Sequence, residues 1–347
     1  MNPRDSVLAM TLVVRDEEEI LATHLDYHLA QGIDVILVTD HGSSDRTPEI
    51  LADYTRDARV RSWREDGPEY RQADWVRRML GVARDEHGAD WVLHGDADEF
   101  WVPLIGTLQD VFEAIPGRYG FLTVPRHTFL PTSLGSDPFY ARMTLRHRVS
   151  KYATGARVLP KVAQRPGAGT GLFRGNHVLE RPAMPAAPDS GTVEIHHFQV
   201  RSYEQLLRRM KRAEVTGDLG GGLSPETLRV RGVYRDGRLP EFYEKLALDP
   251  ARAAAGLETG ELVFDDRVKR FLEGGGTESG SAEARRALAG LWQRAVLWER
   301  AGERERRRRA MRWRHPLDAV TGRWRGSRAP GPAGRAAARS QSWRWPA

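Results

Sequence analysis

Two aspartates separated by one residue, Asp96 and Asp98, carry the clearest chemical signal in this sequence. They directly follow the apolar run Trp91–His94, so they are expected at the end of a buried strand. Carboxylate oxygens ligate Mg²⁺ or Mn²⁺, and water and substrate phosphates complete the shell. A metal held there would neutralise charge on a departing diphosphate. The alternative is a solvated turn without a ligand, since such pairs also arise by chance.

Asp40 ends a second apolar run, Val35–Thr39, and precedes a Gly-Ser-Ser turn. Its carboxylate can accept a hydrogen bond from a nucleobase N–H group. In the alternative interpretation Asp40 only stabilises the turn, and Asp45 caps the helix that follows. Both interpretations can hold at once.

Arginines near the same apolar runs are predicted to hold a diphosphate. Arg15 follows the run Leu8–Val14, and Arg77 and Arg78 lie in a predicted helix. The planar guanidinium group binds phosphate oxygens in pairs, which suits this role. Because Arg77 and Arg78 are adjacent, only one can share the inward side of the helix, and a solvated helix face is the alternative. Arg78 is the predicted ligand.

Two adjacent histidines, His196 and His197, lie in the predicted strand Thr192–Val200. Neighbouring side chains of a strand point to opposite faces, so at most one of the two can face a site. A neutral imidazole can complete a metal shell, and His197 is the predicted ligand. A histidine that forms hydrogen bonds in the core is the alternative.

The elements expected to position these residues alternate between strands and helices. Such alternation predicts a parallel sheet with right-handed crossovers, in which ligands bind beyond the carboxyl ends of the strands. The polar residues named above fall at these ends. The predicted strands are Leu8–Val14, Val35–Thr39, Val60–Trp63 and Trp91–His94, and the helices are Glu17–Ala30, Thr47–Tyr54 and Gln72–His87.

The second half of the chain has a different pattern. The Gly- and Pro-rich stretch Pro160–Pro188 is predicted to form loops over the sheet edge, and its 160–190 region is a natural lid. Other predicted elements are strands at Phe121–Pro125 and Arg142–Val149 and helices at Tyr203–Val215 and Gly290–Trp313.

Composition limits the possible classes of function. The chain has 347 residues and no cysteine, which excludes a thiolate zinc site, an iron–sulfur cluster and a cysteine nucleophile. Its net charge is +6, but residues 299–347 carry fourteen Arg against four acidic residues, so the remainder is mildly acidic. This argues against a nucleic-acid-binding body. An acidic residue precedes the first apolar run, unlike in a signal peptide, and a cytoplasmic protein is expected.

The basic tail, residues 316–347, is rich in Gly, Pro, Ala and Arg and is predicted to be disordered. Trp324, Trp343 and Trp345 stand among its arginines. This combination is typical of a segment that binds an anionic membrane surface, here the inner face of the membrane. A solvated basic tail is the alternative.

Taken together, several of these motifs resemble the family 2-like glycosyltransferases, close to the domain described as family 2 or family 92-like. The resemblance covers roughly residues 7–215. It is carried by Val13-Val14-Arg15-Asp16-Glu17-Glu18-Glu19, Tyr27–Gly32, Val38–Asp45, Gln72, Trp75-Val76, Arg78-Met79, Asp90-Trp91-Val92 through Gly95–Trp101, Gly175-Asn176-His177, His197-Phe198 and Arg201–Gln205.

The resemblance implies an α/β fold, a single Rossmann-like domain of the A type with a mostly parallel central sheet, C-terminal helices and the disordered basic tail. It implies that Asp40 contacts the base, and that Asp96 and Asp98 reach ribose and metal. Relatives usually carry Asn at the position of Asp16, so this aspartate must point away, pair with Arg15 or weaken donor binding. The implied domains are 1–215 for nucleotide-sugar binding, 216–315 as a helical extension, and the tail 316–347.

The implied activity is a metal-dependent transfer of a sugar from a nucleotide-diphosphate donor to an acceptor hydroxyl, with inversion. Mn²⁺ or Mg²⁺ is the expected cofactor. The acceptor is a glycan, as in cell-surface polysaccharide, a lipid-linked compound or a small molecule. Inverting members use a carboxylate base, and Asp137, Glu180 and Asp189 lie in the right stretch without a motif that selects one.

Three alternatives remain. A phosphohydrolase with an aspartate nucleophile also uses Asp-x-Asp, but places it after its first strand and prefers Thr or Val where this chain has Phe100. A nucleotidyltransferase also binds a metal ion and a nucleotide, but it has a Gly-rich phosphate loop where this chain has Arg15-Asp16-Glu17-Glu18. A non-catalytic carbohydrate- or membrane-associated protein that retains the fold would bind metal and nucleotide weakly or not at all.

Overall fold

The computed structural model describes residues 6–67, 69–132, 137–151, 157–169, 171–173, 175–189, 191–218, 225–274 and 282–312. The described residues up to Glu299 belong to one compact unit, and a second unit begins at Arg300. The tail 316–347, with its predicted disorder and membrane contact, lies outside the described residues. The predicted domain boundaries stay predictions. No helix in the described ranges is long and apolar enough to cross a membrane.

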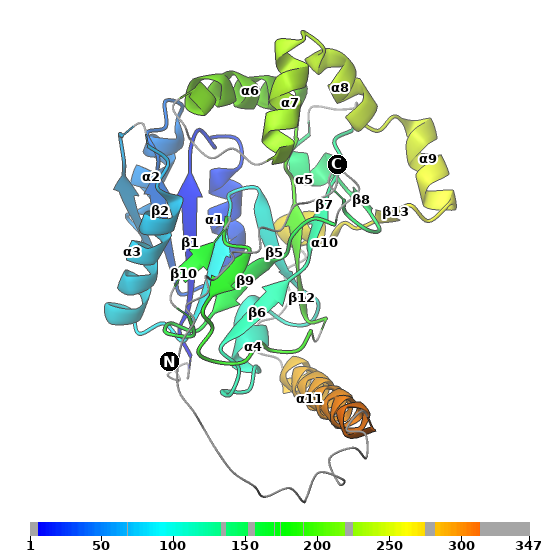
Figure 1. Cartoon of the computed structure of the whole chain (residues 1–347). Helices are drawn as coiled ribbons and strands as arrows, with labels where there is room; N and C mark the ends of the chain where they lie inside the picture. Colours follow the sequence, from blue (N-terminus) through cyan, green and yellow to red (C-terminus); the bar gives the residue numbers. More distant parts are fainter. Residues whose placement is uncertain are drawn as a thin grey trace, which may run out of the picture. The chain divides into compact units, whose positions relative to one another are not determined.

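A six-stranded sheet lies at the centre of the first unit, in the order β3-β2-β1-β4-β9-β6 (Figure 1). The first four strands are parallel, β9 runs antiparallel to β4, and β6 runs antiparallel to β9. The predicted α/β class with a mostly parallel sheet is confirmed. The bounds are β1 Leu8–Val14, β2 Val35–Asp40, β3 Val60–Arg64, β4 Trp91–Gly95, β6 Phe121–Val124 and β9 Lys161–Gln164.

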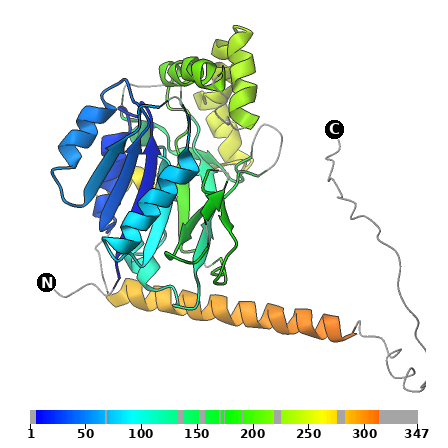
Figure 2. The same cartoon turned by 60° about the vertical axis from the view of Figure 1, so that its left-hand side comes forward.

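Both faces of this sheet are covered, which explains why its strands are continuous apolar runs. Alternate residues of β1 enter different clusters: Met10 and Leu12 pack on the side of α1, whereas Ala9 packs with Met79 of α3. Figure 2 shows α3 against one face of the sheet. The helices of this region are α1 Leu21–Ala30, α2 Thr47–Tyr54, α3 Gln72–Asp85 and α4 Leu108–Glu113.

A second sheet of three strands joins segments far apart in the sequence. Strand β12 (Val193–His197) pairs antiparallel with β5 (Glu99–Pro103) and parallel with β7 (Arg126–Thr128). In this register His197 lies opposite Glu99. The sequence patterns do not predict β5, although all five of its residues are buried.

Two predictions for the second half are wrong. The stretch Pro160–Pro188 is not only loop: it contains β9, a buried inner strand of the main sheet, and the hairpin β10 (Gly171–Phe173) with β11 (Val178–Glu180). A segment that forms sheet ladders on both edges cannot act as a lid, so the lid prediction fails for β9.

The strand predicted at Arg142–Val149 is shorter than expected, and Arg142 does not belong to it. Pro138 fixes the start of a short helix, α5 (Phe139–Arg142), and the strand that follows, β8, covers only Leu145–His147. It pairs with β13 (Leu262–Phe264) from much later in the chain.

Helices dominate the rest of the chain. Leu206, Met210, Val230 and Leu239 form a small apolar cluster that joins α6, α7 and α8. The elements are α6 Tyr203–Asp218, α7 Pro225–Arg235, α8 Leu239–Leu246, α9 Pro250–Glu258, α10 Arg267–Leu272 and α11 Ala282–Arg312.

Candidate active site

The carboxyl ends of β1, β2 and β4 meet at one edge of the main sheet. The ladder pairs Val14 with Asp40 and Leu12 with Gly95, so the residues after these strands come together. This edge is the predicted location of the site.

Asp40 is buried, and both of its carboxylate oxygens are engaged. Oδ1 accepts hydrogen bonds from the backbone N–H of Ser43 at 3.0 Å and from its hydroxyl at 2.5 Å. Oδ2 lies 2.8 Å from Nη1 of Arg64, which the β2–β3 ladder places opposite Asp40. Asp40 therefore stabilises the turn, as the alternative interpretation holds, and its predicted contact with a base stays a prediction. Asp45 accepts from the Thr47 N–H at 2.9 Å in the turn before α2, but the N-cap residue of α2 is Arg46 and no side chain caps the helix, so the predicted cap by Asp45 is wrong.

Asp16 adopts a left-handed backbone conformation (φ 51°) that turns its carboxylate toward the next loop. Oδ1 accepts from the N–H of Ser44 at 2.6 Å, and Oδ2 lies 2.9 Å from Nη1 of Arg212 on α6. Burial raises the pKa of Asp16, but the Ser44 hydrogen bond and the Arg212 charge outweigh it and hold the pKa below its usual value. The extra negative charge is thus offset by Arg212, not by Arg15.

The two predicted phosphate-binding arginines lie in different surroundings. Nε of Arg15 is buried and has no hydrogen-bond partner among the described residues. Arg78 is already held: Nη1 is 2.6 Å from Oε1 of Glu65, Nη2 donates to the Thr39 hydroxyl at 3.3 Å, and the guanidinium lies over the Trp63 ring. Arg15 can bind an incoming anion without losing a side-chain partner, whereas Arg78 would have to exchange one.

Asp96 belongs to a buried ion network that sequence reasoning missed. Nζ of Lys161 lies 2.7 Å from Oδ2 of Asp96 and 3.2 Å from Oε2 of Glu99, and Nη1 of Arg126 lies 2.7 Å from Oε1 of Glu99. Lys161 and Glu99 are fully buried. Burial alone would lower the pKa of Lys161, but the two carboxylates raise it above its ordinary value. The ammonium group therefore remains charged and fixes Asp96 at the sheet edge.

Asp98 and His197 are brought together, as predicted, by the pairing of β5 with β12. Nε2 of His197 lies 3.5 Å from Oδ2 of Asp98, and the N–H of Phe198 donates to the Asp98 carbonyl at 2.8 Å. Burial raises the pKa of Asp98, but His197, Arg209 and Arg201 outweigh it and hold the pKa far below its usual range. Asp98 is therefore ionised at neutral pH and can bind a cation.

Glu17 is a further carboxylate near this pair. Its Oε2 lies 3.2 Å from Nη2 of Arg201, and its N–H donates to the Thr47 hydroxyl at 2.8 Å. Burial, opposed by Arg201 and reinforced by the charge of Asp98, raises the pKa of Glu17 to about 7. Glu17 is one of three consecutive glutamates, so only its position after β1 could have indicated that it lies near Asp98 and His197.

Glu17 should make stability depend on pH. Its ordinary pKa is 4.5, so the folded protein binds the proton more tightly than the unfolded chain does, and stability falls as pH rises from 4.5 to about 7. We expect Glu17→Gln to stabilise the protein by about 1–3 kcal/mol at pH 8 and by little at pH 4.5, in metal-free buffer. Urea unfolding at both pH values measures this. The exposed Glu244→Gln is the control, and an equal effect at both pH values would contradict the assignment.

Arginines of α6 and the loop before it face these carboxylates. Arg209 and Arg201 lower the pKa of Asp98, and Nη1 of Arg212 donates to the Arg15 carbonyl at 2.7 Å. The sequence indicated α6 as a basic helix but did not show that it lies over the end of β1. With Arg15, these side chains form a cationic border to the acidic edge.

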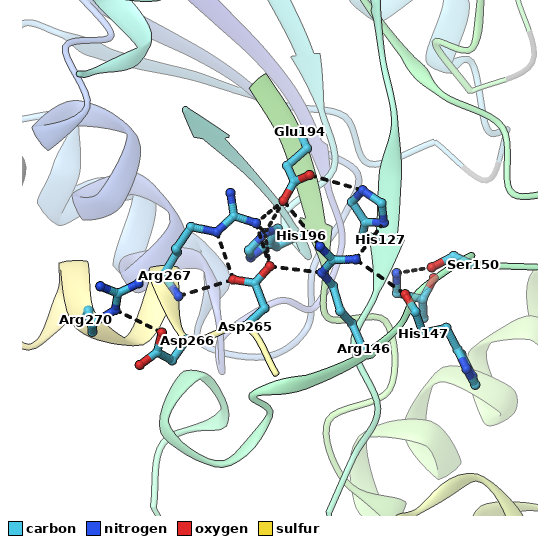
Figure 3. A network of polar contacts seen from close by, with 11 residues as sticks. His127, Arg146, His147, Ser150, Glu194, His196, Asp265, Asp266, Arg267 and Arg270 are labelled. Atoms are coloured by element: carbon cyan, nitrogen blue, oxygen red, sulfur yellow. Dashed lines mark hydrogen bonds and ion pairs between the residues drawn. The ribbon is translucent and has the colours of Figure 1, made fainter. Parts of the chain in front are cut away.

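A second acidic cluster, Glu194, His196 and Asp265, could hold a metal ion by the spacing of its ligand atoms, which lie within 4.8 Å of one another. Figure 3 shows that Arg267 fills this position: its Nη2 donates to both carboxylates and lies 3.0 Å from Nε2 of His196. Arg146 approaches Asp265 from the other side at 2.9 Å. The cluster is an internal ion network, because the guanidinium groups of Arg267 and Arg146 already lie where a metal would bind. His196 thus faces away from His197, as the strand alternation predicts.

The three carboxylates considered as a base lie in different places. Asp137 lines a cavity with Arg201. Glu180 is exposed on β11, and Asp189 accepts a hydrogen bond from the N–H of Gly191 in an exposed loop.

No protein-family model and no curated protein matches the chain. Among solved structures, S. aureus TarS 1–349 in complex with UDP aligns at 15% identity and a TM-score of 0.31 over 47% of each chain. TarS in complex with UDP-GlcNAc aligns at 12% identity and 0.35, over 63% of this chain and 68% of that one. Glucosyl-3-phosphoglycerate synthase from Mycobacterium tuberculosis, with Mn²⁺, UDP-glucose and glycerol 3-phosphate, aligns at 14% identity and 0.27, over 35% and 45%. The alignment with the first of these spans less than half of its length.

Proposed function

We propose that this protein is a metal-dependent glycosyltransferase that transfers a sugar, with inversion, from a nucleotide-diphosphate donor to an acceptor hydroxyl. The observation that carries the proposal is the approach of His197 to Asp98 within 3.5 Å at the edge where β1, β2 and β4 end. Together with Asp96, this pair offers the oxygen and nitrogen ligands that Mn²⁺ or Mg²⁺ accepts.

Asp98 supplies negative charge for a divalent cation, whereas burial and the neighbouring carboxylates, opposed by Lys161, raise the pKa of Asp96. Asp98 is ionised, and the side chain of Asp96 is 39% exposed even though Lys161 holds one of its oxygens. When bound, the metal would neutralise the negative charge that develops on the departing nucleoside diphosphate.

The other residues of the edge would bind and orient the donor. Arg15, with its unpartnered Nε, and Arg209 are placed to attract the diphosphate. The rings of His41 and Trp75 are buried, and the exposed ring of Tyr70, whose centroid lies 5.6 Å from that of His41, is the aromatic surface next to the predicted base contact. Arg78 would contribute only by exchanging its partner Glu65 for phosphate.

A thermal-shift panel of UDP- and GDP-sugars, with and without Mn²⁺, tests this proposal. A ligand that binds only the folded protein at one hundred times its Kd stabilises it by about 2.7 kcal/mol, so we expect a clear rise in Tm with one nucleotide class. The rise should require Mn²⁺ or Mg²⁺. If no nucleotide sugar shifts the Tm of well-folded protein, the non-catalytic alternative replaces this proposal.

A further inference from the structure

A small cavity lies between the start of α5, the start of α6 and the loop before α1. Its volume is about 220 Å³. Drug-sized ligands occupy pockets of about 300–1,000 Å³, so this cavity suits a smaller group. Its polar lining comes from Glu19, Asp137, Arg142, Arg201 and Ser202, and Phe139 supplies an aromatic ring.

The lining balances hydrogen-bond donors against acceptors. Arg142 and Arg201 contribute guanidinium groups, whereas Glu19 and Asp137 contribute carboxylates. An anionic ligand would meet the two carboxylates, and a cationic ligand would meet the two arginines. A hydroxyl group both donates and accepts, so a ligand with several hydroxyls can bind to carboxylates and to guanidinium groups alike.

Two groups of the lining have capacity left to bind. Arg201 has a side chain only 5% exposed, and its Nε is buried without a hydrogen-bond partner in the described ranges. No hydrogen bond or ion pair joins the Asp137 carboxylate to the part of the chain that the structure describes. Arg142 is held in place because its Nε donates to the Asp137 carbonyl at 2.7 Å.

Two residues of the cavity lining contact Phe198, the sequence neighbour of His197. Arg201 lines the cavity, and its Nη1 donates to the Phe198 carbonyl at 3.2 Å. Phe139 packs on Phe198, with ring centroids 5.1 Å apart, and Phe198 directly follows His197. A ligand in the cavity would therefore lie near Asp98 and His197, where the donor sugar is expected.

We propose that this cavity is the acceptor subsite and that it binds an uncharged, hydroxyl-rich group such as a single sugar ring. Asp137 and Arg142 would recognise its hydroxyls, and Phe139 would contact the apolar face of the ring. The inference rests on the proposed function in that the bound sugar is taken to be the acceptor of the transfer. The binding of a neutral sugar can nevertheless be measured without any transfer.

Saturation-transfer NMR on the full chain tests the subsite, with the methyl glycosides of glucose, galactose and mannose as neutral probes. Glucuronic acid and glucosamine serve as charged analogues, and each probe is measured with and without UDP and Mg²⁺. We expect at least one neutral glycoside to bind, and its binding to weaken at least tenfold in Asp137→Asn and in Arg142→Gln. Arg56→Gln, at an exposed arginine just after α2, is the matched control and should bind like wild type.

Three results would overturn the proposal: no neutral glycoside binds wild type, a charged analogue binds at least tenfold more tightly, or the two cavity variants bind like wild type. Nucleotide binding in the thermal-shift panel is a separate readout. Loss of nucleotide binding with retained glycoside binding would reject the proposed function alone, and the reverse would reject this subsite alone.

Discussion

Asp98→Asn is expected to lower the rate of sugar transfer by a factor of about 10²–10³, the usual cost of removing one preorganised electrostatic group from a reaction centre. The asparagine keeps the size of the side chain but removes the negative charge that would bind the metal. It also leaves His197 without its carboxylate partner at 3.5 Å. The rise in Tm that depends on Mn²⁺ should disappear in the same variant, whereas the fold should be retained.

Asp57→Asn provides a control of the same chemistry, because Asp57 pairs with Arg59 on an exposed loop. Its transfer rate and its response to Mn²⁺ should match those of wild type. If Asp98→Asn kept full metal-dependent nucleotide binding, Asp98 would not be a metal ligand, and the metal would have to bind elsewhere.

Lys161→Met is expected to cost about 3–5 kcal/mol of unfolding free energy, because removing one partner of a buried ion network leaves the others uncompensated. The ammonium group lies within 3.2 Å of both Asp96 and Glu99, and neither Lys161 nor Glu99 is reached by solvent. Urea unfolding at pH 7 measures the loss. The loss should shrink as pH falls, since protonation of the two carboxylates removes the uncompensated charge.

The matched control is Lys269→Met, whose partner Glu273 lies one turn away on the surface. Exposed pairs of this kind contribute about 0.3–0.5 kcal/mol, so the two lysines should differ by several kcal/mol. Adding Glu99→Gln to Lys161→Met should recover part of the loss. Fully additive effects of the two substitutions would mean that they do not interact, which would contradict the network.

Local patterns were sufficient for β1 to β4 and for α1 to α3, but not for β5. β1 has the predicted bounds Leu8–Val14, and α2 has the predicted bounds Thr47–Tyr54, because a strand buried on both faces and a helix with Pro48 in its first turn leave clear traces in a short window of sequence. The positions of Asp96, Asp98 and Asp40 at the edge of the sheet likewise follow from their places after apolar runs, whereas their roles stay predictions.

Long-range contacts decide the parts that local patterns missed. Lys161–Gln164 has two polar residues in four, and it is buried as β9 only because Asp96 and Glu99 neutralise Lys161 and because Gln164 contacts His94 at 3.1 Å. Glu99 begins a strand for the corresponding reason, since Arg126 lies against it. These partners are tens of residues away in the sequence, so no window around either residue contains the information.

The pairing of β12 with β5 has a consequence for how the protein is made. His197 and Glu99 lie opposite each other although about a hundred residues of chain separate them, and β13 and β8 are separated by a similar span. Contacts of such high contact order form late and slowly in folding. During synthesis the contact between Asp98 and His197 can therefore form only after β12 has left the ribosome. Until then β5 has an unpaired apolar edge that other nascent chains can contact.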